Sequence, residues 1–450
     1  VDAVVAGRLG MLSPEAHISA ESLAKAARDH DVAEAVAVVR PAHFPFLFPE
    51  VFLRDNPGFD VILGNPPWEE LMVEEPKFWL PLRPGLLGLR PAELKKEIAR
   101  LRRERPDKVA ELEMLVDAVA HERAILLAGP YPGLGTGDID LYQAFAWRFW
   151  LLCRLRGRIG VVIPRSLLNS AGGAKWRVTV IDAAGIDVTT MINTNGWLFP
   201  AVHGQYSIGA IAVTKGEPGH TVRLAGPAHS AKDFIRDSAD PGELPVAMLR
   251  SASTGAAFPQ LPSSAAAAVF TALRSHPRLD ERSEVWDFRP VAEFHATNDR
   301  SIFDAGGHRA GRWPVYGGSA FNLWDPDTGE YYAWATPSVV TKTLQEKRER
   351  QARISSSAFY GLSSSESKSS ATLPCRRPRI AFRDITNSTN KRTVIAALVP
   401  GDVVLTNKAP YLLRRGGTSA ADEAYLLGCL SSVPLDWCAR RFVEITLNLH

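Results

Sequence analysis

Four consecutive residues, Asn65, Pro66, Pro67 and Trp68, offer the groups that chemistry on a planar, amino-bearing ring requires. The amino group of a nucleobase is a poor nucleophile, because its lone pair is delocalised into the ring and its two hydrogens have to be directed. The carboxamide oxygen of Asn65 and the carbonyl of Pro66 can each accept one hydrogen, and the indole of Trp68 can stack on the ring. A base in a duplex has to leave the helix to reach such a corner. Short patterns also occur by chance, so a Pro-Pro turn beside a half-buried tryptophan is the alternative interpretation.

The residues before this corner predict the strand that positions it. Residues 61–63 form a short apolar run, typical of a parallel strand covered on both faces, and Gly64 allows an immediate turn. Ligands gather at the carboxyl ends of such strands. Pro66 and Pro67 fix their own φ angles and bias the preceding residues away from helical geometry. We therefore expect the Asn65 side chain to be held in place and the nearby carbonyls to be free to accept.

Further segments accompany the corner in a fixed order along the chain. They are residues 44–52, 137–145, 157–164, 198–200 followed by the apolar run 208–213, 383–386 and 389–393. With the corner, these segments resemble the gamma-type N6-adenine DNA methyltransferases, particularly the large single-chain type IIG restriction-modification enzymes and related phage-defence methylases. The similarity touches most of the chain, and the order of the segments is more specific than any one of them.

The resemblance implies roles for the corner and for two phenylalanines. Asn65 and Pro66 would orient the target amino group, and Trp68, in place of the commoner tyrosine, would stack on the extruded adenine. Phe145 would pack against the adenine of the cofactor S-adenosylmethionine, and Phe199 would contact the target base from another side. Ordinary core packing is the alternative for each phenylalanine. No catalytic carboxylate is required, since displacement at a sulfonium methyl depends on alignment more than on a strong base.

A second group of side chains, in the part of the chain after residue 280, has the chemistry of DNA contacts. Guanidinium, ammonium and amide groups reach phosphates and base edges, whereas surface turns use some of the same residue types. The candidates for DNA binding are Arg383, Asn387, Asn390, Lys391 and Arg392.

The length and charge of the chain limit the number of domains and the kinds of partner that can be expected. A chain of 450 residues can bury at least two cores, and 46% apolar with 22% charged residues is ordinary for a globular protein. The net charge of +3 does not by itself predict a nucleic-acid partner. Residues 374–415, however, contain nine Lys or Arg against two Asp, which leaves this segment at +7. Such a concentration fits a phosphate-binding surface and a solvated basic face about equally well.

Cysteine spacing and hydropathy exclude several classes of protein. Cys153, Cys375, Cys429 and Cys438 are scattered, with no Cys-x-x-Cys pair and no His pair at ligand spacing, so neither a metal site nor a disulfide framework is expected. No apolar run reaches membrane length, and the first residues lack the pattern of a signal peptide. The cytoplasm is therefore the expected location, without a membrane partner.

We expect an α/β fold in two domains. Residues 1–230 would form a partial catalytic domain with a helical insertion at about 91–127, and residues 231–280 a connector rich in small residues. Residues 281–450 would form an α+β target-recognition domain, incomplete at its C-terminus. The catalytic domain would contain the second half of a Rossmann-like methyltransferase sheet. The patterns predict strands at residues 158–163, 187–193, 206–214, 379–382, 393–397 and 403–407, and a helix at 425–438.

The sequence contains no segments that match the first half of that sheet or its cofactor loop. The acidic-Pro-Ala-Cys-Gly-Ser-Gly type of loop that the family carries is absent. The glycine-rich residues 133–137 are not followed by an acidic residue at the distance that a ribose contact requires. The chain therefore looks like an internal segment of a longer protein or a truncated gene product. The hypothesis is that it binds S-adenosylmethionine poorly or not at all when alone, and micromolar binding in calorimetry would contradict it.

The function expected from the resemblance is methyl transfer from S-adenosylmethionine to adenine N6 in a defined DNA sequence, as part of restriction or phage defence. The expected partners are double-stranded DNA with a flipped adenine and other restriction or defence subunits. A non-catalytic DNA-binding or assembly fragment is one alternative. A protein-glutamine or RNA methyltransferase is another, since those enzymes also use an Asn-Pro-Pro-aromatic corner, although the long region after residue 280 argues against it.

Overall fold

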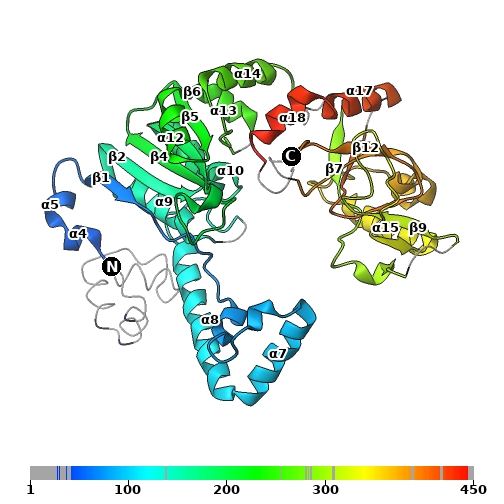
Figure 1. The fold of residues 1–450 in the computed structure, drawn as a ribbon, viewed down its shortest axis with the longest axis horizontal. Coiled ribbons are helices and arrows are strands. Elements are labelled where there is room, and N and C mark those ends of the chain that lie inside the picture. Colours follow the sequence, from blue (N-terminus) through cyan, green and yellow to red (C-terminus); the bar gives the residue numbers. More distant parts are fainter. Residues whose placement is uncertain are drawn as a thin grey trace. The chain divides into compact units, whose positions relative to one another are not determined.

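The computed structural model describes residues 42–136, 139–253, 255–278, 281, 283, 286–306, 310–386, 390–415 and 419–443, together with residues 28, 30 and 37. The chain forms two compact units, Val1–Ala268 and Val269–His450. Figure 1 shows both units and labels many of their elements. Helices and mixed sheets occur together, which confirms the predicted α/β class.

Within the described residues of the first unit, six strands form one mixed sheet in the order β1-β2-β4-β3-β5-β6. β1 runs parallel to β2, and β3 runs parallel to β5. β4 lies antiparallel between β2 and β3, and β6 pairs antiparallel with β5 at the edge. β2, β3 and β4 confirm the strands predicted at residues 158–163, 187–193 and 206–214. The strands are β1 (Phe59–Gly64), β2 (Cys153–Pro164), β3 (Ala184–Ile192), β4 (Ser207–Lys215), β5 (Thr221–Ala228) and β6 (Gly242–Pro245).

Branched aliphatic side chains form the core of this sheet. Ile159, Val161 and Ile163 recur at every second position of β2 and are buried, as the two-residue period of a strand predicts. Helix α9 packs against β2, α11 against β3 and α12 against β5. The helices of this unit are α4 (Phe44–Leu47), α5 (Pro49–Phe52), α6 (Glu75–Trp79), α7 (Pro91–Glu104), α8 (Pro106–Leu127), α9 (Leu141–Leu152), α10 (Ser166–Asn169), α11 (Ala174–Ala183), α12 (Ala231–Ala239) and α13 (Val246–Ala252), with short 3-10 turns η1 (Leu86–Gly88) and η2 (Thr194–Gly196).

Residues 91–127, predicted as a helical insertion, form a pair of helices. α7 ends at Glu104 and α8 begins at Pro106, because proline lacks the N–H that a continuous helix would need at this point. α6, α7 and α8 enclose a small apolar core of their own that includes Trp79 and Leu101. In Figure 1 the pair extends away from the sheet. The insertion therefore has its own packing and does not depend on the sheet for its core.

The segment predicted as a connector, residues 231–280, differs from that expectation over most of its length. Residues up to 268 belong to the first unit, and β6 within them extends the sheet, with Leu244 fully buried. The small residues serve close packing here: a Cβ on Gly242 would lie 2.9 Å from the Cβ of Ala267. Composition alone does not separate this use of glycine and alanine from a flexible link. α14 (Ser264–Arg274) spans the boundary between the units.

The described residues of the second unit contain two four-stranded sheets, in the orders β13-β9-β10-β8 and β12-β11-β14-β7. All strands are short, and helices flank them in the chain, so the unit is α+β as predicted. The strands are β7 (Phe288–Val291), β8 (Phe303–Asp304), β9 (Trp313–Tyr316), β10 (Ala333–Ala335), β11 (Arg379–Phe382), β12 (Ala396–Val399), β13 (Val404–Leu405) and β14 (Tyr411–Arg414). The helices are α15 (Pro337–Gln351), α16 (Ser364–Lys368), α17 (Ala420–Leu430) and α18 (Val433–Arg440), with 3-10 turns η3 (Arg300–Ile302), η4 (Ser370–Thr372) and η5 (Pro374–Arg376).

The single helix predicted at residues 425–438 is instead two helices. α17 ends at Leu430, and Ser432 then caps α18 by accepting a hydrogen bond from the backbone N–H of Leu435. Serine is a favoured N-cap, because its side chain satisfies a backbone donor that the first helical turn leaves free. Two adjacent serines therefore mark a helix boundary rather than a helix interior.

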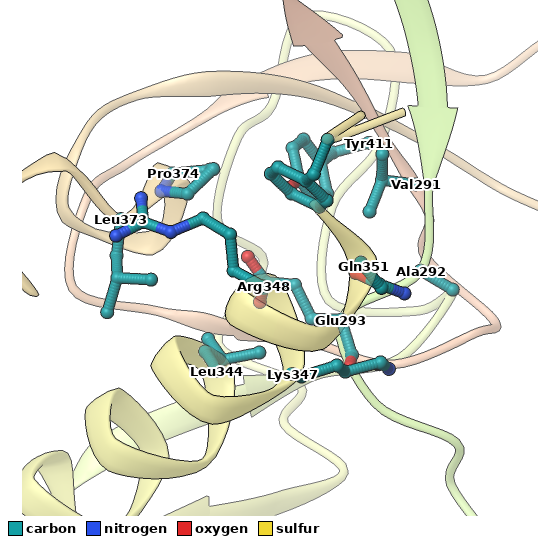
Figure 2. A pocket seen from close by; sticks show the side chains of 11 residues that line it. Val291, Ala292, Glu293, Leu344, Lys347, Arg348, Gln351, Leu373, Pro374 and Tyr411 are labelled. Atoms are coloured by element: carbon teal, nitrogen blue, oxygen red, sulfur yellow. Dashed lines mark hydrogen bonds between the residues drawn. The ribbon is translucent and has the colours of Figure 1, made fainter. Parts of the chain in front are cut away.

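A small cavity in the second unit has a structural role (Figure 2). It measures about 20 Å³ and is lined by Glu293, Lys347 and Arg348 among others. Glu293 is buried and pairs with the buried Arg379 at 2.8 Å, and its second carboxylate oxygen accepts from the N–H of Leu405 at 2.8 Å. A cavity of this size holds about one water molecule. It is therefore part of a buried polar network and too small for a ligand.

Candidate functional site

The predicted corner follows directly on β1, at the carboxyl end of the parallel pair β1 and β2. Asn65 and Pro67 are exposed, Pro66 is buried and Trp68 is half-buried. Among the described residues, the carboxamide of Asn65 has no hydrogen-bond partner. Both of its polar atoms are therefore available to a ligand. The prolines restrict the backbone beside it, but no hydrogen bond within the described residues holds the side chain, contrary to the expectation from the sequence.

Trp68 lies in a cluster of aromatic rings. Its indole meets Phe199 edge-on, with 5.3 Å between ring centroids and an interplanar angle of 87°. It also stacks on Tyr206, at 5.6 Å and 7°. Within the described structure the indole N–H of Trp68 is buried without a hydrogen-bond acceptor, which is uncommon for a buried donor. The cluster thus brings together two residues that the sequence assigned to one base, Trp68 and Phe199.

Tyr206 is the residue of this cluster that sequence reasoning missed. It lies immediately before β4, and its ring is 38% exposed. Its position next to an apolar run favoured its interpretation as part of a strand. The sequence did contain one signal that Tyr206 belongs to the site. Tyr206 ends the loop that starts with Asn193 and carries Phe199, and the two ends of such a loop lie on the same side of the sheet.

Asn193, at the end of β3, holds that loop in place. Its side chain is fully buried and makes four hydrogen bonds. The Oδ1 atom accepts from the N–H groups of Leu198 and Phe199, both at 3.1 Å. The Nδ2 atom donates to the carbonyls of Phe199 and Val202, both at 2.8 Å. Its backbone N–H donates to the carbonyl of Tyr206 at 3.0 Å, so one residue positions both aromatic neighbours of Trp68.

We expect Asn193→Asp to destabilise the first unit by about 2 kcal/mol or more, because two donors are lost and a carboxylate faces the carbonyls of Phe199 and Val202. Chemical denaturation measures the free energy of unfolding, and amide hydrogen exchange measures the opening of residues 194–206. Thr190→Val on the same strand is the control, since it removes one buried hydrogen bond, to Ala225, outside the loop. The same exchange rate in residues 194–206 for both variants would contradict the role of Asn193.

Phe145 lies on α9, and its ring is 37% exposed. It packs against Phe149, with 5.9 Å between ring centroids. The ring of Phe149 lies close to Gly64, where an added Cβ would be 3.1 Å from it. Phe145 is therefore one ring away from the end of β1. Its partial exposure separates it from a fully buried core residue and leaves ring surface for a ligand.

Backbone pairing fixes the corner against the start of α9. The N–H of Leu71 donates to the carbonyl of Ile139 at 2.8 Å, and the N–H of Leu141 donates to the carbonyl of Glu69 at 3.0 Å. The residues directly after Trp68 are thus paired with the residues directly before α9. The predicted base-binding side of the corner and the helix that carries Phe145 form one connected piece of structure.

Close by on α9, Tyr142 donates to or accepts from Ser166 at 2.7 Å. Burial raises the pKa of the Tyr142 hydroxyl to about 12. The hydroxyl therefore stays protonated at neutral pH and acts as a neutral hydrogen-bonding group between α9 and α10.

Two of the predicted DNA contacts are used inside the second unit. Arg383 donates to the carbonyl of Phe321 at 2.7 Å, and burial lowers the pKa of its guanidinium. Arg392 donates to the carbonyl of Ser431 at 2.7 Å and lies 3.3 Å from the carboxylate of Asp436. In this structure both arginines stabilise the fold.

The other candidates lie at the surface of that unit or outside the described residues. Asn390 and Lys391 are exposed, and Arg440 binds both of their carbonyls, at 2.9 and 3.1 Å, which holds the backbone in place. Lys391 has no side-chain partner among the described residues. Asn387 lies outside the described residues. The structure therefore leaves Asn390 and Lys391 accessible to a phosphate or a base.

Neither a metal site nor a membrane span stands out in the part of the chain that the structure describes. No group of three His, Cys, Asp or Glu side chains there lies close enough to hold a metal ion. No helix there has the length and apolar character needed to cross a bilayer. The four cysteines are free thiols.

Comparisons with known proteins give partial similarities only. No protein-family profile matches the chain, and no curated protein matches it. Among solved structures, it is similar to the type IIL restriction-modification enzyme MmeI in complex with DNA, with 13% identity, a TM-score of 0.37, and 72% of this chain and 42% of that chain covered. The type IIG restriction endonuclease BpuSI gives 14% identity and a TM-score of 0.30, over 86% of this chain and 45% of that chain.

A modification subunit of a putative type I restriction enzyme from Vibrio vulnificus YJ016 gives 14% identity and a TM-score of 0.22, over 37% of this chain and 26% of that chain. The chain thus spans less than half the length of each of these three proteins. TM-scores in this range do not define a shared fold, so the function has to be inferred from the residues of the site.

Proposed function

We propose that this chain is part of a DNA methyltransferase that transfers a methyl group from S-adenosylmethionine to adenine N6, within a restriction-modification or phage-defence system. The observation that carries the proposal is the corner itself. Asn65 is exposed with an unbonded carboxamide, and it follows a parallel strand beside the cluster of Trp68, Phe199 and Tyr206. A planar ring with an amino group is the ligand that uses an amide, a carbonyl and an aromatic face together.

Each group of the corner has a role in this reaction. An adenine extruded from the duplex would lie against the rings, with N6 at Asn65 and Pro66. The Oδ1 of Asn65 and the carbonyl of Pro66 would each hold one N6 hydrogen, which turns the nitrogen lone pair out of the plane of the ring. The rings of Trp68 and Phe199 would keep the base in this orientation. Alignment of this kind is the main contribution a site can make to a displacement reaction.

S-adenosylmethionine, when bound, supplies a methyl group on a positively charged sulfur. The half-exposed ring of Phe145 fits the adenine of this cofactor, and backbone pairing connects its helix to the corner. The sheet would then be the half of a Rossmann-like methyltransferase sheet that carries the target base. In support, β1 and β2 run parallel with the corner at their carboxyl ends, where ligands bind in such sheets.

The second unit would serve target recognition on DNA. Exposed Asn390 and Lys391, with Asn387 nearby in the sequence, have side chains that contact base edges and phosphates. Arg383 and Arg392 would contribute indirectly, by stabilising the second unit through their hydrogen bonds to the carbonyls of Phe321 and Ser431. The domain boundaries proposed from the sequence shift accordingly, with residues up to 268 in the catalytic unit.

Transfer of tritium from labelled S-adenosylmethionine to three acceptors tests the proposal. The full chain is incubated with duplex DNA, with RNA and with release-factor protein, at a cofactor concentration high enough to offset the weak S-adenosylmethionine binding expected of the chain alone. Each sample is compared with the Asn65→Ala variant. We expect label on DNA only, and loss of that label in the variant. Label on RNA or protein would support the second alternative. DNA binding without any transfer would support a non-catalytic DNA-binding or assembly role.

A further inference from the structure

The second unit contains an open groove of about 560 Å³, the Trp324 groove. It is lined by Trp324, Arg377, Leu398, Arg414 and Leu427 among others. The groove runs along α17 and beside β12 and β14, so its apolar floor is made by the fold itself. At this volume it admits a ligand the size of a nucleotide or larger.

Trp324 is held in an unusual backbone conformation. Its φ of 63° lies in the left-handed region, where a bulky side chain is strained. The turn around it is fixed by two backbone hydrogen bonds between Asn322 and Asp325, at 2.8 and 3.0 Å. The indole is nevertheless 70% exposed. A strained backbone that presents a large aromatic side chain to solvent indicates a contact with a ligand, because the folded chain gains no packing from it.

The charged side chains of the groove define the ligand further. Arg377 is exposed and has no side-chain partner among the described residues. Arg414 forms an ion pair with Glu423 at 3.4 Å, so these two charges offset one another. The guanidinium of Arg377 is therefore left unpaired in the groove that the exposed indole also lines. An aromatic plane next to a free guanidinium is the combination that binds a base and its phosphate.

We propose that the Trp324 groove binds a nucleotide unit of a DNA strand, with Trp324 stacked on a base and Arg377 on a phosphate. This inference rests on the proposed function, which provides DNA as the partner. An apolar floor also suits a helical peptide. The unpaired guanidinium of Arg377 favours DNA, because an apolar helix in the groove would leave the charge of Arg377 without a partner.

Fluorescence anisotropy with labelled single-stranded DNA of mixed sequence and with the matching duplex, at several salt concentrations, tests the groove, because a base can stack on Trp324 only when it lies outside a duplex. Trp324→Gly removes the indole and relieves the backbone strain, so the folded state is retained while DNA affinity falls about tenfold or more. Arg377→Gln should lower the slope of log affinity against log salt by about 1. Arg350→Gln on α15 is the matched control, since it removes an exposed charge outside the groove and should leave the affinity unchanged.

The outcomes separate the groove from the function it rests on. A Trp324→Gly variant that binds DNA as tightly as the wild-type chain would overturn the assignment of DNA to the groove and leave the proposed function standing. If Arg377→Gln and Arg350→Gln lowered the slope of log affinity against log salt concentration equally, the phosphate contact of Arg377 would be wrong. A wild-type chain that binds no DNA at any salt concentration would overturn both the groove and the DNA partner of the proposed function. A folded Trp324→Gly variant with tenfold weaker binding supports the proposal.

Discussion

Asn65→Ala is expected to lower methyl transfer to DNA by about 100-fold or more, because the N6 amino group loses one of the two acceptors that align it. The effect should appear in kcat, with little change in the KM for DNA, since a contact made at the reacting atom adds little to the binding of a whole duplex. Initial rates at saturating cofactor and DNA measure it. The variant should fold normally, because Asn65 is exposed and has no side-chain bond to a described residue.

Asn56→Ala is the matched control for this prediction. Asn56 also belongs to the first unit, and its amide donates to the carbonyl of Leu155 at 3.1 Å, away from the aromatic cluster. It should change transfer little. If Asn65→Ala kept the wild-type kcat while both variants remained folded, the amide would not orient the reacting group and the mechanism would be wrong.

The second large effect is expected at Trp68. Trp68→Ala should weaken the capture of an extruded base by about 10- to 100-fold, since stacking of one base on an aromatic ring contributes about 1–3 kcal/mol. A DNA duplex with a single unpaired 2-aminopurine reports this capture directly, because the fluorescence of the probe changes as it leaves the stack and meets another ring. The measurement needs neither the recognition sequence nor turnover.

Trp68→Tyr provides the conservative comparison. Trp68 is half-buried and packed against Phe199, so Trp68→Ala also removes packing from the first unit. Tyrosine keeps an aromatic plane in this place and should retain most of the capture. A folded Trp68→Ala protein that gave the wild-type fluorescence change would show that the indole belongs to the core alone.

Local patterns in the sequence were sufficient to predict much of the secondary structure of the first unit. The position of the strand before the corner follows from an apolar run and a glycine. Its predicted burial on both faces is wrong, because β1 is an edge strand in which Val61 and Leu63 are 57% and 80% exposed. The break between α7 and α8 follows from Pro106. In each case the determining interaction lies within a few residues of the pattern. Such interactions include the missing N–H of a proline and the burial of alternate side chains.

The parts that could not be predicted depend on partners far away in the chain. Asn193 was read as the last residue of a strand, although its side chain organises the loop up to Tyr206. β12 starts later than predicted, because the N–H groups of Thr393 and Val394 both donate to the carboxylate of Asp436 instead of to a neighbouring strand. Nothing near residue 393 in the sequence indicates an acceptor 43 residues further on.

The predicted DNA contacts also depended on partners that the sequence does not reveal. Arginine in a basic segment suits a phosphate and also suits a buried carbonyl, and the sequence does not distinguish the two uses. Arg392 binds the end of α17 and Asp436, whereas Lys391 beside it is exposed. Only the tertiary structure separates these neighbours.

The identity of the methylated nucleoside shows whether the Asn65 corner acts on adenine N6. DNA incubated with the full chain and S-adenosylmethionine is digested to nucleosides and analysed by mass spectrometry, with Asn65→Ala in parallel. The account predicts N6-methyldeoxyadenosine in the wild-type sample and its near absence with the variant. Methylation of cytosine, or equal amounts of methyladenine from both proteins, would contradict it.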